Sequence, residues 1–182
     1  MNAPRFAFLS RLLHWLMAAM ILAMLFIGIG MVSSLADYHW LLSIHRPLGI
    51  AILALAALRL VNRQLNPPPP LPADMPRAIR LAAHASHVAL YALMFAVPLV
   101  GWAMLSAGGY PVVLYGTLQL PPILPLDVAL YAVLRTAHTV LAFALFAVFL
   151  LHLAAALMHA LVFRDGVLES MASLRPGRGG QG

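Results

Sequence analysis

Long apolar runs separated by short polar or proline-rich connectors dominate the hydropathy pattern of this sequence. A helix needs about 20 mainly apolar residues to cross the hydrocarbon core of a membrane. Four runs reach this length, at about residues 12–32, 40–61, 79–105 and 128–163. The last exceeds what a bilayer requires, so we expect it to tilt or to project beyond the membrane. The pattern predicts an all-α integral membrane protein folded as a four-helix bundle.

The connectors differ in character. Residues 64–76 contain four consecutive prolines at 67–70, which cannot be helical and predict a stiff extended strap. Residues 106–127 form an apolar stretch punctuated by Gly and Pro, which we expect to be a loop at the interface or over the bundle. We expect residues 1–170 to form one transmembrane domain, and the Gly- and Arg-rich residues 171–182 to be a disordered tail.

Composition strengthens the membrane prediction. The 182 residues are 63% hydrophobic and 9% charged, whereas soluble chains carry about 25% charged residues. The net charge of +6 comes from scattered arginines, which indicates membrane-flanking charge and no nucleic-acid partner. The absence of Cys excludes disulfides, thiolate metal sites, iron–sulfur clusters and thioether-linked haem.

The arginines also predict the orientation. If the N-terminus is inside, every arginine except Arg46 and Arg135 falls on the cytoplasmic side, as the positive-inside rule requires. We therefore predict that both termini are cytoplasmic. The apolar run of the first helix is longer than the 7–15 residues of a signal-peptide core, so we expect this helix to be retained.

Histidines outnumber carboxylates, eight to five. In the predicted bundle they fall at two depths, with His39 in the first outer loop. The inner half contains His14, His84, His87, His152 and His159, and the outer half contains His45 and His138. Ionisable groups inside a membrane are costly and by default mark function. A single buried histidine could be a neutral imidazole that hydrogen-bonds across the bundle. Such a structural role explains a set of histidines at two depths less well.

The fourth helix supplies the sharpest spacing. His138 and His152 are separated by fourteen residues, which is about 21 Å of helical rise and brings both side chains to within about 40° of one direction. His14 on the first helix is near the inner face, and His45 on the second is near the outer face. Each depth therefore has at least one pair of histidines from different helices.

Several kinds of metal centre or cofactor could bind between such pairs of histidines. Carboxylate-bridged dimetal centres need inward-facing Glu, but all five acids lie in loops or tails. Structural zinc prefers four ligands, and the outer level offers two deep histidines. Copper is not excluded, because ten Met are present as further possible ligands. Haem needs only one or two axial ligands in an apolar slot, so two bis-histidine haem b groups fit the count best.

Two further features bear on haem. Gly49 shares a face with His45, where it would let a macrocycle approach the backbone or let two helices pack closely. The two outer arginines, Arg46 and Arg135, lie beside His45 and one turn before His138. They are candidate partners of haem propionates, with snorkelling to lipid headgroups as the alternative.

Short motifs spread over nearly the whole chain carry a family resemblance. They lie at residues 11–15, 44–50, 59–63 with the following proline strap, 83–87, 98–101, 137–139 and 151–159. With them the sequence resembles the bacterial cytochrome b561 family, four-helix dihaem membrane cytochromes related to the cytochrome b subunits of nickel-iron hydrogenases. The resemblance implies a multi-pass protein of the bacterial inner membrane, in contact with lipid.

The resemblance also implies ligands and an activity. His14 with His152 would hold an inner haem b, and His45 with His138 an outer one. The protein would be an oxidoreductase that moves electrons between ubiquinone or ubiquinol, its substrate, and a periplasmic donor or acceptor. Superoxide is one such donor in the family, which would make the chain a superoxide:ubiquinone oxidoreductase. The chain differs from the family member that resembles a superoxide oxidase in having no Lys and an outer loop with almost no basic residues.

His159 shares a helix face with His152 and is an alternative partner for His14. Otherwise His87 and His159 are candidates for a quinone site, hydrogen-bonding a carbonyl or relaying protons, with structural hydrogen bonding as the competing role. Two other functions remain. One is a cytochrome b anchor subunit of a hydrogenase or dehydrogenase, although the lack of a fifth span favours a stand-alone protein. The other is a transporter or scaffold without haem.

Overall fold

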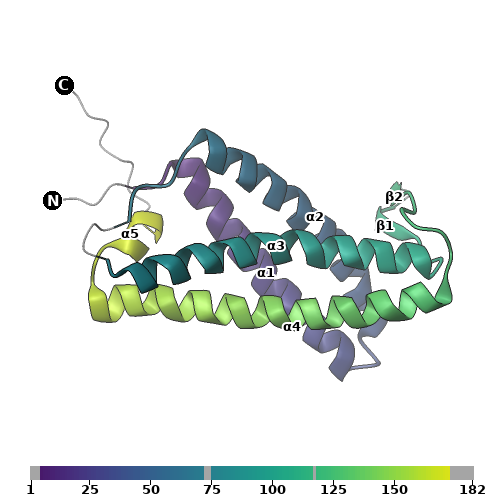
Figure 1. The fold of residues 1–182 in the computed structure, drawn as a ribbon. Coiled ribbons are helices and arrows are strands. Elements are labelled where there is room, and N and C mark those ends of the chain that lie inside the picture. The colour runs from purple at the N-terminus through teal and green to yellow at the C-terminus, as the bar shows by residue number, and fades with distance from the viewer. Residues whose placement is uncertain (1–4, 72–74, 117, 173–182) are drawn as a thin grey trace.

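The computed structural model describes residues 5–71, 75–116 and 118–172, and helices make up most of them. The four long helices are α1 (Phe8–Ser33), α2 (Tyr38–Leu65), α3 (Arg77–Ala107) and α4 (Val128–Met158). Helix α4 continues as a π-helix, η1 (His159–Phe163), and a short α5 (Val167–Ala172) follows (Figure 1). Each long helix, with α4 and η1 counted as one, is long and apolar enough to cross a membrane. The predicted all-α membrane four-helix bundle is confirmed.

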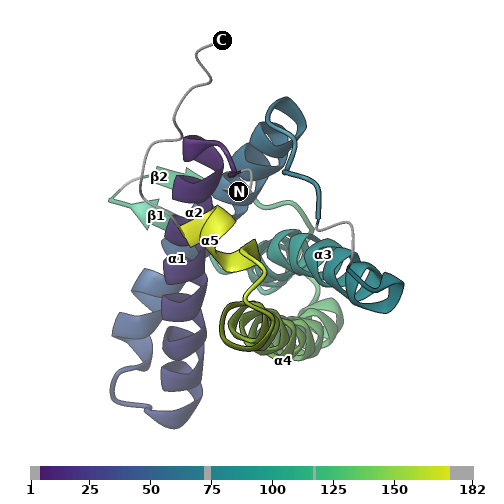
Figure 2. The ribbon, with the colours of Figure 1, turned by 90° about the vertical axis from the view of Figure 1, so that its left-hand side faces the viewer.

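The helices form two antiparallel hairpins. Helices α3 and α4 run side by side along their whole length, and α1 packs along α2 (Figure 1). The α1–α2 hairpin crosses the α3–α4 pair obliquely, and its closest backbone approach is between α2 and α3 (Figure 2). In the part of the chain that the structure describes, α1 and α4 make no comparably close approach. Side chains therefore bridge the space between the first hairpin and α4.

Local sequence explains where the helices begin and end. The Asp127 carboxylate accepts a hydrogen bond from the Leu130 amide at 3.0 Å and caps the start of α4. Helix α3 ends at Gly108 and Gly109, and Gly109 has the positive φ of 72° that glycine adopts without strain. Helix α2 stops just before the four prolines at 67–70, which are not helical, as predicted.

The connector between α3 and α4 contains a small antiparallel hairpin that the sequence analysis did not predict. Its strands are β1 (Val112–Tyr115) and β2 (Leu118–Leu120), with Val112 opposite Leu120. Gly116, with φ of 56°, lies between them. Each strand is too short to show the alternation that identifies a strand in sequence. A second difference from the sequence prediction is His39, which we expected in a loop and which lies in the first turn of α2.

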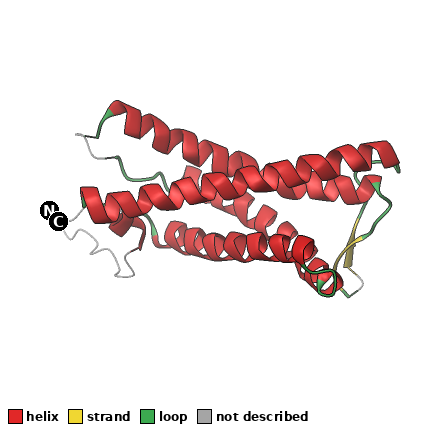
Figure 3. Cartoon of the chain, turned by 90° about the horizontal axis from the view of Figure 1, so that it is seen from below, coloured by secondary structure: helices red, strands yellow, loops and turns green. Residues whose placement is uncertain are grey.

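The two ends of the bundle differ, and Figure 3 shows the helices running between them. At one end α5 folds back over the start of α1, where the Phe6 amide donates to the Ser170 carbonyl at 3.2 Å and Trp15 Nε1 to the Met171 carbonyl at 3.2 Å. We call this the α5 end, and the opposite one the β-hairpin end. Of the predicted tail, Met171 and Ala172 belong to α5, and residues 173–182 lie outside the described residues.

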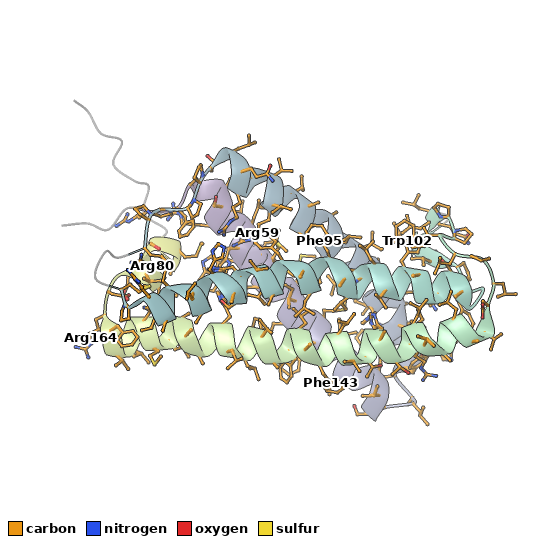
Figure 4. The ribbon with its side chains drawn as sticks, viewed as in Figure 1. Arg59, Arg80, Phe95, Trp102, Phe143 and Arg164 are labelled. Atoms are coloured by element: carbon orange, nitrogen blue, oxygen red, sulfur yellow. The ribbon has the colours of Figure 1, made fainter. Side chains whose placement is uncertain are left out.

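The buried core is small and lies midway along the bundle. It consists of Met17, Ile21, Ile52, Ala56, Met94 and Leu145, with partly buried neighbours such as Phe95. Many large apolar side chains instead face outward, among them Phe143, which is 64% exposed on the outer surface of α4 (Figure 4). Lipid covers such a surface in a membrane protein, so the inside-out pattern agrees with the spans.

Candidate haem sites

The pair nearer the β-hairpin end joins α2 to α4. The ring centres of His45 and His138 lie 6.1 Å apart, and the ring planes are inclined by 68°. His138 Nδ1 lies 3.1 Å from the Val97 carbonyl oxygen, to which it can only donate. The other ring nitrogen, Nε2, then carries no proton and is available to a metal. Histidines that bind metals are commonly oriented in this way.

A glycine on α3 makes room for the His138 ring. A Cβ at Gly101 would lie 3.0 Å from His138 Cε1 and 3.2 Å from Nδ1. Gly49, the position that the sequence analysis had singled out, would meet only the Met24 methyl at 3.7 Å. In the sequence, Gly101 is marked only by its place three residues after Pro98 on an otherwise apolar helix. That the His138 ring of α4 lies against it is visible only in the folded structure.

This contact yields a prediction. We expect Gly101→Val to displace the His138 ring and abolish metal binding at this pair, because overpacking of this kind costs about 1–3 kcal/mol and moves side chains off their rotamers. Gly28→Ala is the matched control, because nothing lies within 4 Å of the added Cβ. Haem content and optical spectra of the purified variants provide the measurement. A Gly101→Val protein with an unchanged spectrum would contradict the prediction.

The two arginines of this level retain unused donors. Arg46 Nη1 donates to the Pro111 carbonyl at 3.4 Å, but its buried Nε has no acceptor among the described residues. Arg135 lies exposed on α4, on the same side of the helix as Tyr131 and Thr139. Arg46 is thus able to donate to an anionic group placed beside the His45–His138 pair, and Arg135 is a second cation at this level, one turn before His138 on α4.

Three histidines gather toward the α5 end. His152 of α4 lies between His14 of α1, at 6.3 Å between ring centres and 67° between planes, and His87 of α3, at 5.4 Å and 64°. The Trp15 ring lies 5.3 Å from that of His14. Helices α1, α3 and α4 therefore meet at His152. Helix α1 contributes the His14 ring and α3 the His87 ring.

His159 lies apart from this cluster. Its Nδ1 is 2.6 Å from Asp165 Oδ2, and its ring packs on Phe163 at 5.2 Å. Asp165 is held in turn, because its other oxygen accepts from the Val167 amide at 3.1 Å. The His87 ring therefore lies against His152, whereas His159 is paired with the Asp165 carboxylate, which follows η1 in the chain. The two predicted quinone-site residues therefore do not share a ring contact.

A polar cluster at the α5 end ties three helices together. Arg59 donates from Nε to the Tyr91 hydroxyl at 3.1 Å and from Nη1 to the Ser10 carbonyl at 3.4 Å. The buried Asn62 amide donates to Ser10 Oγ at 2.7 Å. Figure 4 shows Arg59 between α2 and α3. In the sequence, Arg59 counts toward the charge bias and belongs to the motif at 59–63, but its partners Ser10 and Tyr91 come from distant parts of the chain.

The histidine pairs can be tested against the group they are predicted to hold. A metal–imidazole bond is about 2 Å and a ring nitrogen lies about 1.1 Å from its ring centre, so two imidazoles on opposite sides of one iron have centres about 6 Å apart. The His45–His138 and His14–His152 spacings of 6.1 and 6.3 Å fit this value, and the 5.4 Å of His87–His152 is shorter.

No further His, Asp or Glu side chain completes a metal site at either pair within the described residues. Within residues 5–71, 75–116 and 118–172, no three His, Asp or Glu side chains converge on a point where a metal ion could bind. A metal held by only two imidazoles needs a group that brings the remaining ligands with it, as a porphyrin does. The residues present therefore fit haem.

The profile of the prokaryotic cytochrome b561 family matches residues 5–173. The chain belongs to this family. A cytochrome b carries haem b, so this cytochrome is a bacterial haem protein of electron transport that spans the membrane with four helices.

Two relatives align with almost the whole of this cytochrome. Cytochrome b561 homolog 2 of Escherichia coli (strain K12) is 33% identical over 175 residues, which cover 93% of each chain. The probable superoxide oxidase CybB of Yersinia pestis is 32% identical over 167 residues, which cover 91% of this cytochrome and 94% of that relative. The family resemblance found in the sequence is confirmed.

Proposed function

We propose that this cytochrome is a dihaem oxidoreductase that transfers electrons between a periplasmic one-electron partner, superoxide, and ubiquinone. The observation that carries the proposal is the presence of two facing histidine pairs with ring centres 6.1 and 6.3 Å apart, one toward each end of the bundle. His45 and His138 hold one haem b, and His14 and His152 hold the other. When bound, haem b supplies a one-electron couple between ferric and ferrous iron.

The orientation follows from charge. Arg59, Arg80 and Arg164 lie toward the α5 end (Figure 4), and cytoplasmic sides of bacterial membrane proteins are rich in such residues. We therefore place the α5 end and both termini in the cytoplasm, in the inner membrane, and the β-hairpin in the periplasm. His45 and His138 then form the outer pair, and His14 and His152 the inner pair.

The protein between the two pairs excludes water. Leu145 lies seven residues from both His138 and His152 on α4, and it packs with Met17 and Ile52 in the central core. This apolar layer separates the two levels. An electron that crosses it moves through part of the membrane potential, which is worth about 2.3 kcal/mol per charge per 100 mV for a full crossing.

The inner end provides the groups that a quinone needs. His87 is half-buried beside His152, where its imidazole can hydrogen-bond a quinone carbonyl. The His159–Asp165 pair, 2.6 Å apart near the cytoplasmic end of α4, is suited to pass protons toward it. The reaction balances when two superoxide anions give two O2 and ubiquinone gains two electrons and two cytoplasmic protons to become ubiquinol.

Superoxide is favoured as the donor because the relative from Yersinia pestis is named a probable superoxide oxidase and aligns over nearly the whole chain. Arg46 and Arg135 are the cations beside the outer pair, and positive charge there attracts an anionic substrate. With only these two arginines and no Lys, we expect weaker electrostatic attraction than a lysine-rich surface would give.

Stopped-flow spectroscopy tests the proposal. We expect superoxide to reduce the haem bands of the purified cytochrome, ubiquinone to reoxidise them, and the first rate to fall modestly as salt is raised. Added superoxide dismutase should abolish the reduction. Reduction by ubiquinol but not by superoxide would exclude this donor, and a large subunit purified in fixed ratio would indicate an anchor instead.

A further inference from the structure

Arg11, in the first turn of α1, is a buried cation to which the function above assigns no role. Only 7% of its surface is exposed, yet Nε and Nη1 have no hydrogen-bond acceptor among the described residues. The guanidinium carbon lies 6.0 Å from the centre of the Phe8 ring. An aromatic face attracts a cation but leaves these N–H groups without an acceptor.

The protein supplies no anion for this charge within the residues that the structure describes. The ion pair found there joins His159 to Asp165. Asp37 and Asp127 start helices α2 and α4 at the β-hairpin end, and Glu169 is exposed on α5. A buried guanidinium without acceptors is strongly unfavourable, because both its charge and its donors have lost water. Its burial therefore indicates an anionic ligand bound at Arg11.

The position of Arg11 identifies the neighbouring site. It precedes His14 by three residues, so the two side chains lie about 60° apart on α1 and about 4.5 Å apart along its axis. Arg135 precedes His138 on α4 by the same interval. Each of these helices enters the bundle from its own end and presents first an arginine and then, one turn deeper, a histidine of a facing pair.

We propose that Arg11 binds a propionate carboxylate of the inner haem. The inference rests on the proposed function, because it needs a haem held by His14 and His152. A guanidinium group forms paired, charge-assisted hydrogen bonds with a carboxylate, which would satisfy Nε and Nη1 together. Its positive charge beside the haem also favours the reduced, less positive iron and raises the midpoint potential of that haem.

Redox titration of Arg11→Gln tests this role. We expect the variant to retain both haems while the oxidised-to-reduced ratio of the inner haem at fixed potential rises about tenfold, which is a midpoint about 59 mV lower for one electron. The outer haem should be unchanged. Arg77→Gln, which removes an exposed arginine at the start of α3, and Asp74→Asn should leave both midpoints unchanged.

Three outcomes would overturn the inference. The first is an unchanged inner midpoint in Arg11→Gln with loss of tightly bound phospholipid, measured as phosphorus, since the anion would then be a lipid phosphate. The second is a midpoint shift in Asp74→Asn as large as that of Arg11→Gln and opposite in sign, since loss of a carboxylate raises a midpoint; Asp74 would then be the partner of Arg11. The third is a shift confined to the outer haem.

A second variant covers failure to fold. If Arg11→Gln does not accumulate, Arg11→Lys keeps the charge but loses the planar pair of donors. We then expect the propionate-bending band of the inner haem to shift in resonance Raman spectra, and an unshifted band would overturn the inference. A wild-type protein with fewer than two haems would instead refute the proposed function, whatever Arg11 binds.

Discussion

His138→Ala should remove one of the two haems and leave the other with an unchanged spectrum. An imidazole nitrogen is a direct ligand of iron in the proposed site, and alanine offers no replacement. The Val97 carbonyl and Gly101, which contact the His138 ring, provide no imidazole nitrogen in its place. The pyridine haemochrome assay on purified protein should give about half the wild-type haem per chain, and superoxide should no longer reduce the remaining haem rapidly.

The partner residue and a control sharpen this experiment. His45→Ala should lose the same haem, and the double variant should lose no more than either single one, because both residues bind one iron. His39→Ala is the matched control, because His39 is an exposed histidine at the start of the same helix, α2. Loss of both haems in the double variant, with one retained in each single variant, would mean that the two residues bind different irons.

His152→Ala should remove the inner haem and lower electron exchange with ubiquinone to background, while the outer haem remains reducible by superoxide. His14→Ala should have the same effect, because these two rings have the 6.3 Å spacing of a bis-histidine iron. Haem content, redox titration and ubiquinol oxidation measured on the same preparations separate loss of the cofactor from loss of the reaction.

The neighbouring histidines provide the comparison. His87→Ala should keep both haems but slow the ubiquinone reaction, and His159→Ala should keep both haems because its ring is bound to Asp165. His84→Ala, an exposed position on the same helix as His87, is the control for both. If His159→Ala rather than His152→Ala removed the inner haem, the pairing would be wrong. If His87→Ala removed it, the iron would be held by His87 in place of His14.

The sequence by itself determined the membrane spans and the fold class. Twenty or more apolar residues have a single low-energy structure in lipid, the hydrogen-bonded helix, so hydropathy identifies each span without tertiary information. The repeat of the α-helix likewise places His138 and His152 along one stripe of α4, about 21 Å apart. Arginine counts predicted the orientation, because charge is distributed along the chain and needs no knowledge of packing.

Only the tertiary structure decided which side chains meet. His152 lies between His14 and His87, whereas His159, on the same helix face by its spacing, binds Asp165. Gly101 packs on the His138 ring, and Arg11 is buried without an acceptor among the described residues. The physical reason lies in the solvent. Lipid and core are equally apolar, so the hydropathy of a membrane helix does not show which face turns inward. The rotation and tilt of each helix come from packing between segments distant in sequence, and that packing forms the two histidine pairs.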